Sequence, residues 1–297
     1  MRARYIVPAF AAAAVLLLTG CVDNSTTTDT TPSGDASTIE ADAAAVALLP
    51  EDIKSAGVLI IGTDAAYPPN EYKDESGAPI GWGIELSNGI AAKLGLDPEY
   101  EIASFDTIIP KITGGTVDIG ESSFTDNLER EKQVDFVNYF NAGILWAAPV
   151  GSTVDPDKAC GLTVAVQSNT VQDTDELPAK NAACAAAGLE PIEVLPYGSQ
   201  DEATNAVVLG KADALSADSP VTLYAISKAE GKLEPAGESF EVAPYGITVD
   251  KGSELTQAVQ AALQSMVDDG SYGKILSKWG VTDGGIDTIT INAASNG

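Results

Sequence analysis

Short apolar runs of strand length alternate along this chain with longer stretches whose apolar residues recur every three or four positions. The run at 58–62 is typical of a buried strand, and the stretch at 84–94 has helical spacing. Strands that alternate with helices predict a parallel α/β sheet. In the first half we expect strands at 58–62, 99–103, 117–119 and 135–137 and helices at 50–56, 84–94 and 105–113.

The same alternation restarts near residue 162. Between the two patterns, residues 144–149 and 238–245 are extended. The simplest arrangement is a second lobe inserted into the first, with lobe 1 at 43–146 plus 244–290 and lobe 2 at 147–243. Two extended crossings between lobes form a hinge that permits closure over a ligand. The remaining expected elements are strands at 163–166, 192–195, 213–216 and 245–249, and helices beginning near 171 and spanning 199–209, 219–228, 254–267 and 272–279.

The N-terminal residues have the pattern of an export signal. Within residues 1–20, Arg2 and Arg4 precede an apolar run that is too short to span a bilayer. The run ends at Cys21 in a sequence that resembles the lipobox of bacterial lipoproteins, in which the cysteine is acylated, for example with palmitate. The alternative is an ordinary signal peptide with a chance cysteine. Residues 21–42 lack apolar periodicity, which predicts a disordered tether.

Composition excludes several classes of function. The 297 residues include 44% hydrophobic residues and carry a formal net charge of −27, which argues against nucleic-acid binding. The chain contains no histidine, which excludes Ser-His-Asp sites and histidine-based zinc sites. If Cys21 carries lipid, Cys160 and Cys184 remain as a pair. In an exported protein such a pair predicts one disulfide, the alternative being two buried free thiols.

Candidate binding chemistry lies between residues 121 and 136. Ser122, Ser123 and Thr125 precede a predicted helix that contains Arg130. Free N–H groups at a helix start, hydroxyls and a guanidinium together suit a small carboxylate. The alternative is a helix cap with a surface ion pair from Arg130 to Asp126 or Glu131.

Six segments occur in an order and spacing that resemble family 3 extracellular solute-binding proteins, the polar amino-acid receptors of ABC importers. The resemblance covers roughly residues 45–280 and implies a two-lobed periplasmic-binding-protein-like fold of type II. The segments are 62–69, 105–110, 121–136, 170–172, 212–219 and 272–279.

The resemblance also implies roles for individual residues. Arg130 is similar to the clamp on the ligand's α-carboxylate, with Ser123, Thr125 and, from the other lobe, Thr170. Asp218 is similar to the acceptor for the α-ammonium, although it is also placed to cap the next helix. Asp64, Tyr67 and Phe105 correspond to walls of the side-chain pocket, and plain core is the alternative for Phe105. The candidate ligand-binding set is Asp64, Tyr67, Trp82, Phe105, Ser122, Ser123, Thr125, Arg130, Thr170, Gln172 and Asp218.

The chain departs from the family pattern at several positions. Asn70 stands where a stacking Phe is common, and Gly83 stands where the family has an acid. Glu121 replaces a small or apolar residue and, if it faces the cleft, favours cationic or amide ligands. Asn169 replaces a Gly at a position expected to need φ > 0. Pro178 is expected to kink or shorten its helix.

These observations predict a lipid-anchored, extracytoplasmic, monomeric receptor that passes a polar amino acid to the permease and ATPase subunits of an ABC importer. We expect no cofactor, no metal and no catalytic activity. One alternative is a sensor domain for a separate signalling partner. The other is a dehydratase-like enzyme on the same fold, in which Glu71 or Glu121 acts as general acid or base. The identity of the amino acid stays open.

Overall fold

The computed structural model describes residues 39–296. The predicted signal peptide, the predicted acylation site Cys21 and the predicted tether as far as residue 38 lie outside these residues. At the end of the predicted tether, Ile39 packs against the hydrophobic core and Asp42 caps α1 (Ala43–Val46) through two backbone N–H groups. The folded domain therefore begins a few residues before the predicted boundary.

The first lobe is built on the strand β1 (Val58–Thr63), which pairs in parallel with β5 and β6. Apolar side chains of β1 are covered by α3, whose positive-φ caps at Gly81 and Gly95 define its two ends. The predicted polar loop after β1 contains two short strands that were not predicted, β2 and β3, and together with β4 they form a small three-stranded antiparallel sheet. The elements here are α2 (Glu51–Ala56), β2 (Ala66–Tyr67), β3 (Glu71–Lys73), β4 (Pro79–Ile80), α3 (Trp82–Leu94), β5 (Asp97–Ile102), α4 (Phe105–Thr113) and β6 (Ile119–Gly120).

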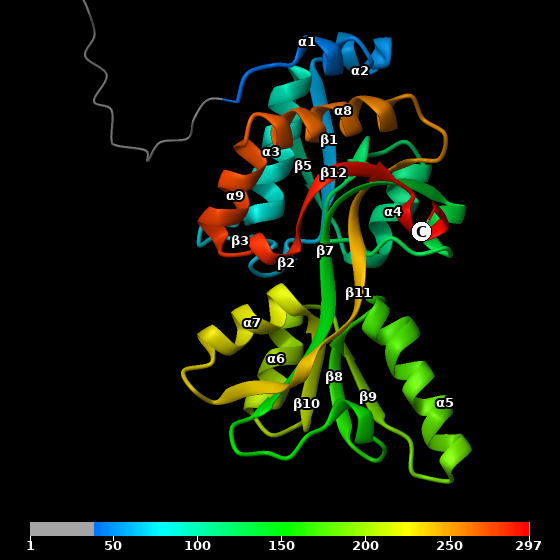
Figure 1. Ribbon diagram of the computed structural model, residues 1–297, viewed down its shortest axis with the longest axis vertical. Helices are drawn as coiled ribbons and strands as arrows, with labels where there is room; N and C mark the ends of the chain where they lie inside the picture. The colour runs from blue at the N-terminus through cyan, green and yellow to red at the C-terminus, as the bar shows by residue number, and fades with distance from the viewer. Residues whose placement is uncertain (1–38, 297) are drawn as a thin grey trace, which may run out of the picture. The chain divides into compact units, whose positions relative to one another are not determined.

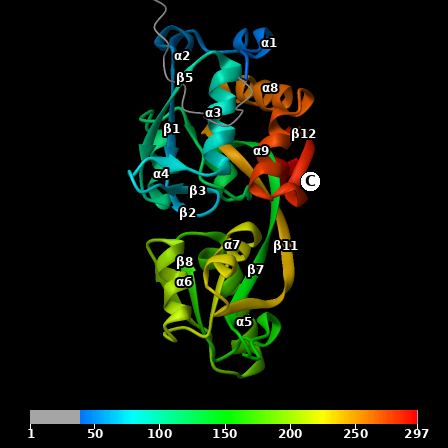
Figure 2. The same ribbon diagram turned by 90° about the vertical axis from the view of Figure 1, so that its left-hand side faces the viewer.

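Two long antiparallel strands form the predicted crossings. β7 (Val134–Pro149) and β11 (Leu233–Asp250) are paired from Leu233 opposite Pro149 to Asp250 opposite Val134. In both views they lie side by side and connect the two groups of elements (Figure 1 and Figure 2). The segments predicted at 135–137 and 144–149 are thus one continuous strand, because the side chains between them are almost all buried.

The second lobe repeats the α/β pattern. β8 lies between β9 and β10 and pairs in parallel with both, and β10 joins the crossing strand β7. The described strands form a sheet in the order β5-β1-β6-β11-β7-β10-β8-β9, with β12 paired to β7. The two-lobed α/β fold is as predicted. The elements of the second lobe are β8 (Thr163–Gln167), α5 (Leu177–Ala187), β9 (Glu193–Tyr197), α6 (Gln200–Val208), β10 (Ala214–Asp218) and α7 (Ser219–Lys228).

The chain returns to the first lobe through β11. α8 (Leu255–Asp268) and α9 (Ser271–Trp279) pack on its core, as predicted. β12 (Gly285–Ile291) and α10 (Ala293–Asn296) follow and were not predicted. Among the described residues, no helix is long and apolar enough to cross a membrane.

The buried hydrophobic residues support the predicted lobe boundaries, which we retain as a proposal. Two clusters draw their residues from 45–142 and 245–289, and two others from 144–236 with Tyr67 added. Tyr67 belongs to the first lobe by sequence but packs within a cluster of the second. It is therefore one of the side chains that hold the lobes together.

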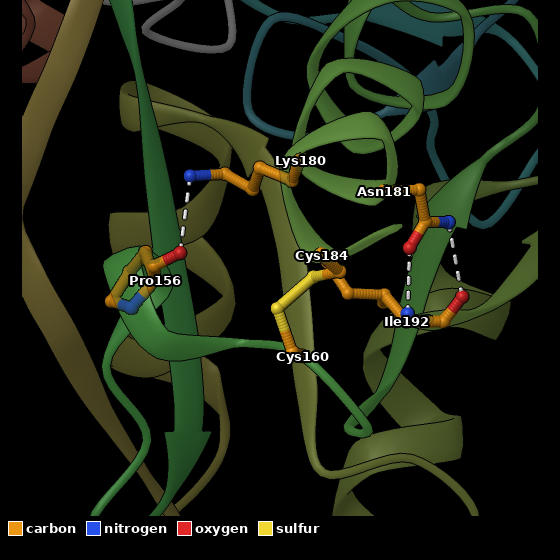
Figure 3. Close-up of a disulfide and its surroundings, with 6 residues drawn as sticks. All are labelled: Pro156, Cys160, Lys180, Asn181, Cys184 and Ile192. Carbon is orange, nitrogen blue, oxygen red and sulfur yellow. Dashed lines mark hydrogen bonds between the residues drawn. A yellow bond between two sulfur atoms is a disulfide. The ribbon is translucent and has the colours of Figure 1, made fainter. Parts of the chain in front are cut away.

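The predicted disulfide is present between Cys160 and Cys184 (Figure 3). It joins the turn before β8 to α5, as expected. Beside it, the side-chain amide of Asn181 exchanges two hydrogen bonds with the main chain of Ile192, and Lys180 donates to the carbonyl of Pro156. α5 is thereby fastened to the segment before β8 and to the loop before β9.

Candidate functional site

A small pocket, with a cavity volume of about 10 Å³, lies where the carboxyl ends of β1 and β8 meet the ends of β6 and β10. In α/β folds, this end of a parallel sheet is where ligands bind. Both lobes contribute to its walls. The lining residues are Asp64, Tyr67, Phe105, Ser122, Ser123, Thr125, Arg130, Gln167, Thr170, Val171, Gln172 and Asp218. The pocket therefore brings together every candidate from the sequence except Trp82.

Arg130 is the cation of this pocket. Its guanidinium donates to the carbonyl of Thr125 at 2.9 Å and, across the lobes, to that of Asn169 at 3.2 Å. It lies over the rings of Phe105 and Phe124, which stack on each other. Among the described residues it forms no ion pair, so the alternative of a surface salt bridge is wrong. Burial lowers the pKa of Arg130 to about 10.

Asp218 is a buried anion at the end of β10. Its side chain accepts hydrogen bonds from Gln172 Nε2 at 2.7 Å and from the Tyr245 hydroxyl at 2.6 Å. It occupies the N-cap position of α7, yet its carboxylate makes no capping bond, so the capping alternative is wrong. Burial raises the pKa of Asp218, and Arg130 opposes that rise.

Asp64 is a second anion, contributed by the loop after β1. It accepts a hydrogen bond from Gln167 Nε2 at 2.5 Å across the lobes. Burial raises its pKa to about 6, and the bond from Gln167 opposes the rise. The charged lining thus consists of one arginine and two aspartates, which gives the pocket a formal charge of −1 when all three are ionised.

Hydrogen bonds across the gap show that the lobes are closed on each other. Besides the bonds from Arg130 and Gln167, the backbone N–H of Asp218 donates to the Tyr67 hydroxyl at 3.1 Å. The hydroxyl of Tyr245, which lies on β11 in the part that belongs to the first lobe, donates to the carboxylate of Asp218. Each bond requires both lobes, so the geometry of the pocket depends on closure.

The hydroxyl residues line the pocket in a different way from the one predicted. The stretch after Thr125 is not an α-helix but a single 3₁₀ turn, Arg130–Lys132, and Ser123 has a positive φ of 51°. The helix start predicted at Ser122, Ser123 and Thr125 is therefore not formed. The Ser122 hydroxyl accepts from the Asp64 N–H, and the Thr170 hydroxyl donates to the carbonyl of Gln167. These hydroxyls shape the loops around the pocket.

Trp82 is the candidate that the structure places elsewhere. It is fully buried in the core, packs on Tyr139 and Phe140, and donates from Nε1 to Asn70 Oδ1 at 2.7 Å. Its apolar ring belongs to the inner face of α3, so the assignment to the ligand set is corrected. Asn70 and Glu121 are also fully buried and do not line the pocket.

Two lining residues were missed by sequence reasoning. Gln167 ends β8, one residue beyond the predicted end of that strand, and Val171 follows Thr170. The rule that ligands lie at the carboxyl ends of strands would have found Gln167 if the strand had been extended by one position. The predicted positive φ of Asn169 is confirmed at 64°.

The pocket still offers acceptors. Among the described residues, Gln167 Oε1 and Gln172 Oε1 are buried without a hydrogen-bond partner. Together with Asp64 and Asp218, they give the pocket a surplus of acceptors over the single guanidinium. The arrangement suits a small molecule with one carboxylate and several N–H groups.

Comparisons with known proteins agree with this geometry. The chain is 42% identical over 248 residues to the arginine-binding protein ArgT of Corynebacterium glutamicum, covering 83% of this chain and 82% of the relative. A structure of an ancestral arginine-binding protein bound to arginine aligns with a TM-score of 0.69 and 33% identity, covering 75% of this chain and 98% of the other. An ancestral amino acid-binding protein described as a precursor of cyclohexadienyl dehydratase aligns with a TM-score of 0.66 and 32% identity, over 77% and 98%.

A family model also covers most of the folded residues. It describes bacterial extracellular solute-binding proteins of family 3 and matches residues 59–282, which include both lobes, both crossings and the whole pocket lining. The chain therefore belongs to the bacterial extracellular solute-binding proteins, family 3.

Proposed function

We propose that this solute-binding protein captures a cationic amino acid, with L-arginine as the preferred ligand, and delivers it to an ABC importer. The observation that carries the ligand class is the charged lining of one arginine and two aspartates. A zwitterion uses one charge of each sign for its two termini. The remaining anion then requires a positive charge on the side chain of the ligand.

The three charges have separate roles in this proposal. Arg130 binds the α-carboxylate, because its guanidinium lies against two aromatic rings, donates to two carbonyls and forms no ion pair among the described residues. Asp218 accepts the α-ammonium. Asp64 and the free Oε1 of Gln167 receive the side chain of the ligand, on which a guanidinium offers five N–H donors.

The relatives support arginine over other cations. The printed names of the curated relative and of the ancestral structure both refer to arginine. The alignment with the first of them, at 42% identity, covers more than four-fifths of both chains. Delivery to a permease and an ATPase follows from the family and not from a surface identified on this chain.

We propose no catalytic step for the bound amino acid. The two glutamates that sequence reasoning offered as acid or base, Glu71 and Glu121, are fully buried outside the pocket lining. The two acids in the lining already accept hydrogen bonds from Gln167, Gln172 and Tyr245. A role as sensor remains the alternative, and neighbouring genes for a permease would argue against it.

Cell placement is proposed at two levels. Membership of an extracellular family places the domain outside the cytoplasm. A palmitate-type lipid on Cys21 as the membrane anchor, and a monomeric state, are proposals that rest on the sequence alone. Mass spectrometry of the native N-terminus and light scattering of the purified domain test them.

The Asp64→Asn variant tests the ligand class. Removing the second anion should weaken arginine binding by about 2 kcal/mol or more, or about thirtyfold, because a buried charge pair is lost. Glutamine binding should change by less than about threefold.

In the wild type, arginine affinity should fall as the pH drops below about 6, where Asp64 takes up a proton. The variant should lack this fall. Isothermal titration calorimetry measures all of these.

Asp106→Asn is the matched control, since Asp106 acts on the charge of Asp64 but does not line the pocket. It should leave arginine binding within about threefold of the wild type. A wild-type protein that binds glutamine or glutamate more tightly than arginine would overturn the proposal.

A further inference from the structure

Two carboxyl groups share a buried site behind the pocket. Glu71 on β3 and Glu121 after β6 are both fully buried. A Cβ placed on Gly83 would lie 2.2 Å from Glu71 Oε1 and 2.6 Å from Glu121 Oε1, so the two oxygens flank the same point. Any larger residue at position 83 would collide with them. Gly83, which stands where the family has an acid, thus leaves the space that the carboxyl group of Glu121 occupies.

Hydrogen bonds connect this pair to the pocket through Ser123. The indole N–H of Trp82 can only donate, and it donates to Asn70 Oδ1, which fixes the orientation of that amide. Asn70 Nδ2 must then donate to the Ser123 hydroxyl, at 2.8 Å. With one lone pair engaged in this way, the hydroxyl donates its proton to Glu71, at 2.9 and 3.1 Å from the two carboxyl oxygens. The Ser123 hydroxyl therefore uses its proton and one lone pair behind the pocket.

What Ser123 offers the pocket is consequently its main chain. The residue is in the left-handed conformation, with φ 51°, which is unfavourable for a side chain other than that of glycine, asparagine or aspartate. Among the described residues, neither its N–H nor its C=O has a main-chain partner. The bonds from Asn70 and to Glu71 hold Ser123 in this conformation.

The pair must retain a proton to be stable. No lysine or arginine forms an ion pair with either carboxyl group in the part of the chain that the structure describes. The Tyr139 hydroxyl donates to Glu121 Oε1 at 2.8 Å. The other carboxyl oxygen of Glu121, Oε2, is buried without a hydrogen-bond partner among the described residues. Two ionised carboxylates that flank the same point, in a site of low dielectric, repel each other strongly.

The surrounding elements add no positive charge. The titratable groups that act on the pair are Tyr139 on β7, Tyr100 on β5 and Asp64 after β1, all neutral or acidic. Burial raises the pKa of Glu121 to about 8, and burial together with repulsion from Glu121 raises the pKa of Glu71 well above its usual range. At neutral pH, the pair therefore holds at least one proton.

We propose that Glu71 and Glu121, sharing a proton, are positioning residues that hold Ser123 in the conformation from which its main chain contacts the bound amino acid. The inference rests on the proposed function, because it concerns the same pocket. When the pair loses its last proton, the two buried anions repel each other and move apart, which carries the carboxyl oxygens of Glu71 away from the Ser123 hydroxyl. Ligand affinity then falls, although neither glutamate touches the ligand.

The Glu121→Gln variant tests this inference, because an amide keeps the acceptor for Tyr139 and adds a permanent N–H toward Glu71. It therefore mimics the protonated state of the pair. For wild-type protein, the Kd for L-arginine should rise at high pH, by up to about tenfold per pH unit, once the pair has lost its last proton. For Glu121→Gln, it should stay at the low-pH value of the wild type. The ratio of the two Kd values at each pH cancels the titration of arginine itself.

Two further variants sharpen the test. Glu121→Ala should lose at least about tenfold in affinity at pH 7 while remaining folded by circular dichroism, so that only the isosteric amide rescues binding. Asp118→Asn removes a carboxyl group at the other end of β6, whose pKa is also raised by burial, and should keep the wild-type pH profile.

The outcomes separate this inference from the proposed function. If wild-type protein binds no arginine at any pH, the proposed function fails. If wild-type protein binds arginine and the profiles of wild type and Glu121→Gln coincide at every pH at which both proteins remain folded, the positioning role is overturned. An unchanged affinity in Glu121→Ala would overturn it as well.

Discussion

At the scale of single residues, the site is defined by charges that the protein leaves without a full complement of partners. Arg130 has carbonyls and aromatic rings around it but no carboxylate within ion-pair distance among the described residues. A partly buried guanidinium without an anion is costly, and a ligand carboxylate removes that cost. This asymmetry distinguishes Arg130 from the seven lysines that do form ion pairs with carboxylates among the described residues.

Arg130→Ala should therefore abolish most binding. We expect a loss of about 2–5 kcal/mol, equal to about 30- to 5,000-fold in Kd, because the ligand carboxylate would be left unpaired in a closed pocket. Calorimetry with arginine measures the loss. Arg130→Lys is the matched variant, and it should recover part of the affinity because it keeps the charge without the planar pair of donors. Equal affinities for Arg130→Ala and wild type would remove Arg130 from the site.

Sequence reasoning located this arginine correctly but explained its surroundings wrongly. The hydroxyls of Ser122, Ser123 and Thr125 suggested a helix start, yet the chain there is an irregular loop ending in one 3₁₀ turn. The Ser123 hydroxyl forms its hydrogen bonds behind the pocket, where it accepts from Asn70 and donates to Glu71. Those partners come from a strand about 50 residues earlier, and no local pattern encodes such a contact.

At the scale of elements, hydrophobic periodicity predicted most strands and helices because their buried faces are regular. α4 has its predicted bounds, and α7 agrees as well. The misses have physical reasons. β2 and β3 are too short for a periodic signal, and β12 has a burial pattern that is mostly exposed. Pro178 was expected to disturb its helix, and it lies in the first turn of α5, after a wide π-helical turn at Gln172–Glu176.

The disulfide acts on one of these elements, α5. Cys160→Ser should lower the free energy of unfolding by about 3 kcal/mol, because the bond closes a loop of about 25 residues in the unfolded chain. The melting temperature should fall by several degrees while arginine binding persists, since neither cysteine lines the pocket. Differential scanning calorimetry measures the first effect and titration the second.

The double variant Cys160→Ser, Cys184→Ser provides the control for this prediction. Its melting temperature should match that of the single variant, because both lack the same bond. A single variant that melts like the wild type would show that the bond contributes nothing to stability. A loss of binding with the fold intact would place the disulfide in the site.

At the scale of the whole molecule, contacts outside the pocket also join the lobes. Tyr72 of β3 lies 6.2 Å from Tyr224 of α7, and 6.4 Å from Trp279 of α9, between ring centroids. Tyr72 and Trp279 belong to the first lobe and Tyr224 to the second. None of the three lines the ligand pocket. The cluster therefore contributes to the closed arrangement and not to the choice of ligand.

Tyr224→Ala should weaken the binding of every ligand by the same factor. The expected loss is about 0.5–1.5 kcal/mol, or about two- to twelvefold, because an aromatic contact present only on closure disappears. Titrations with arginine, lysine and ornithine give the ratios. Leu223→Ala, an exposed neighbour on α7, should leave all three affinities unchanged. A change in the order of preference would contradict the assignment to closure.

The paired crossings β7 and β11 restrict how the lobes move apart. Sliding one strand along the other would break a ladder of main-chain hydrogen bonds, whereas bending the ribbon at its irregularities, between Ala236 and Phe240 and between Phe240 and Ala243, keeps most of them. Separation is therefore a rotation about an axis across this ribbon. The mouth widens most at the rim farthest from the two strands, so an amino acid enters and departs on that side.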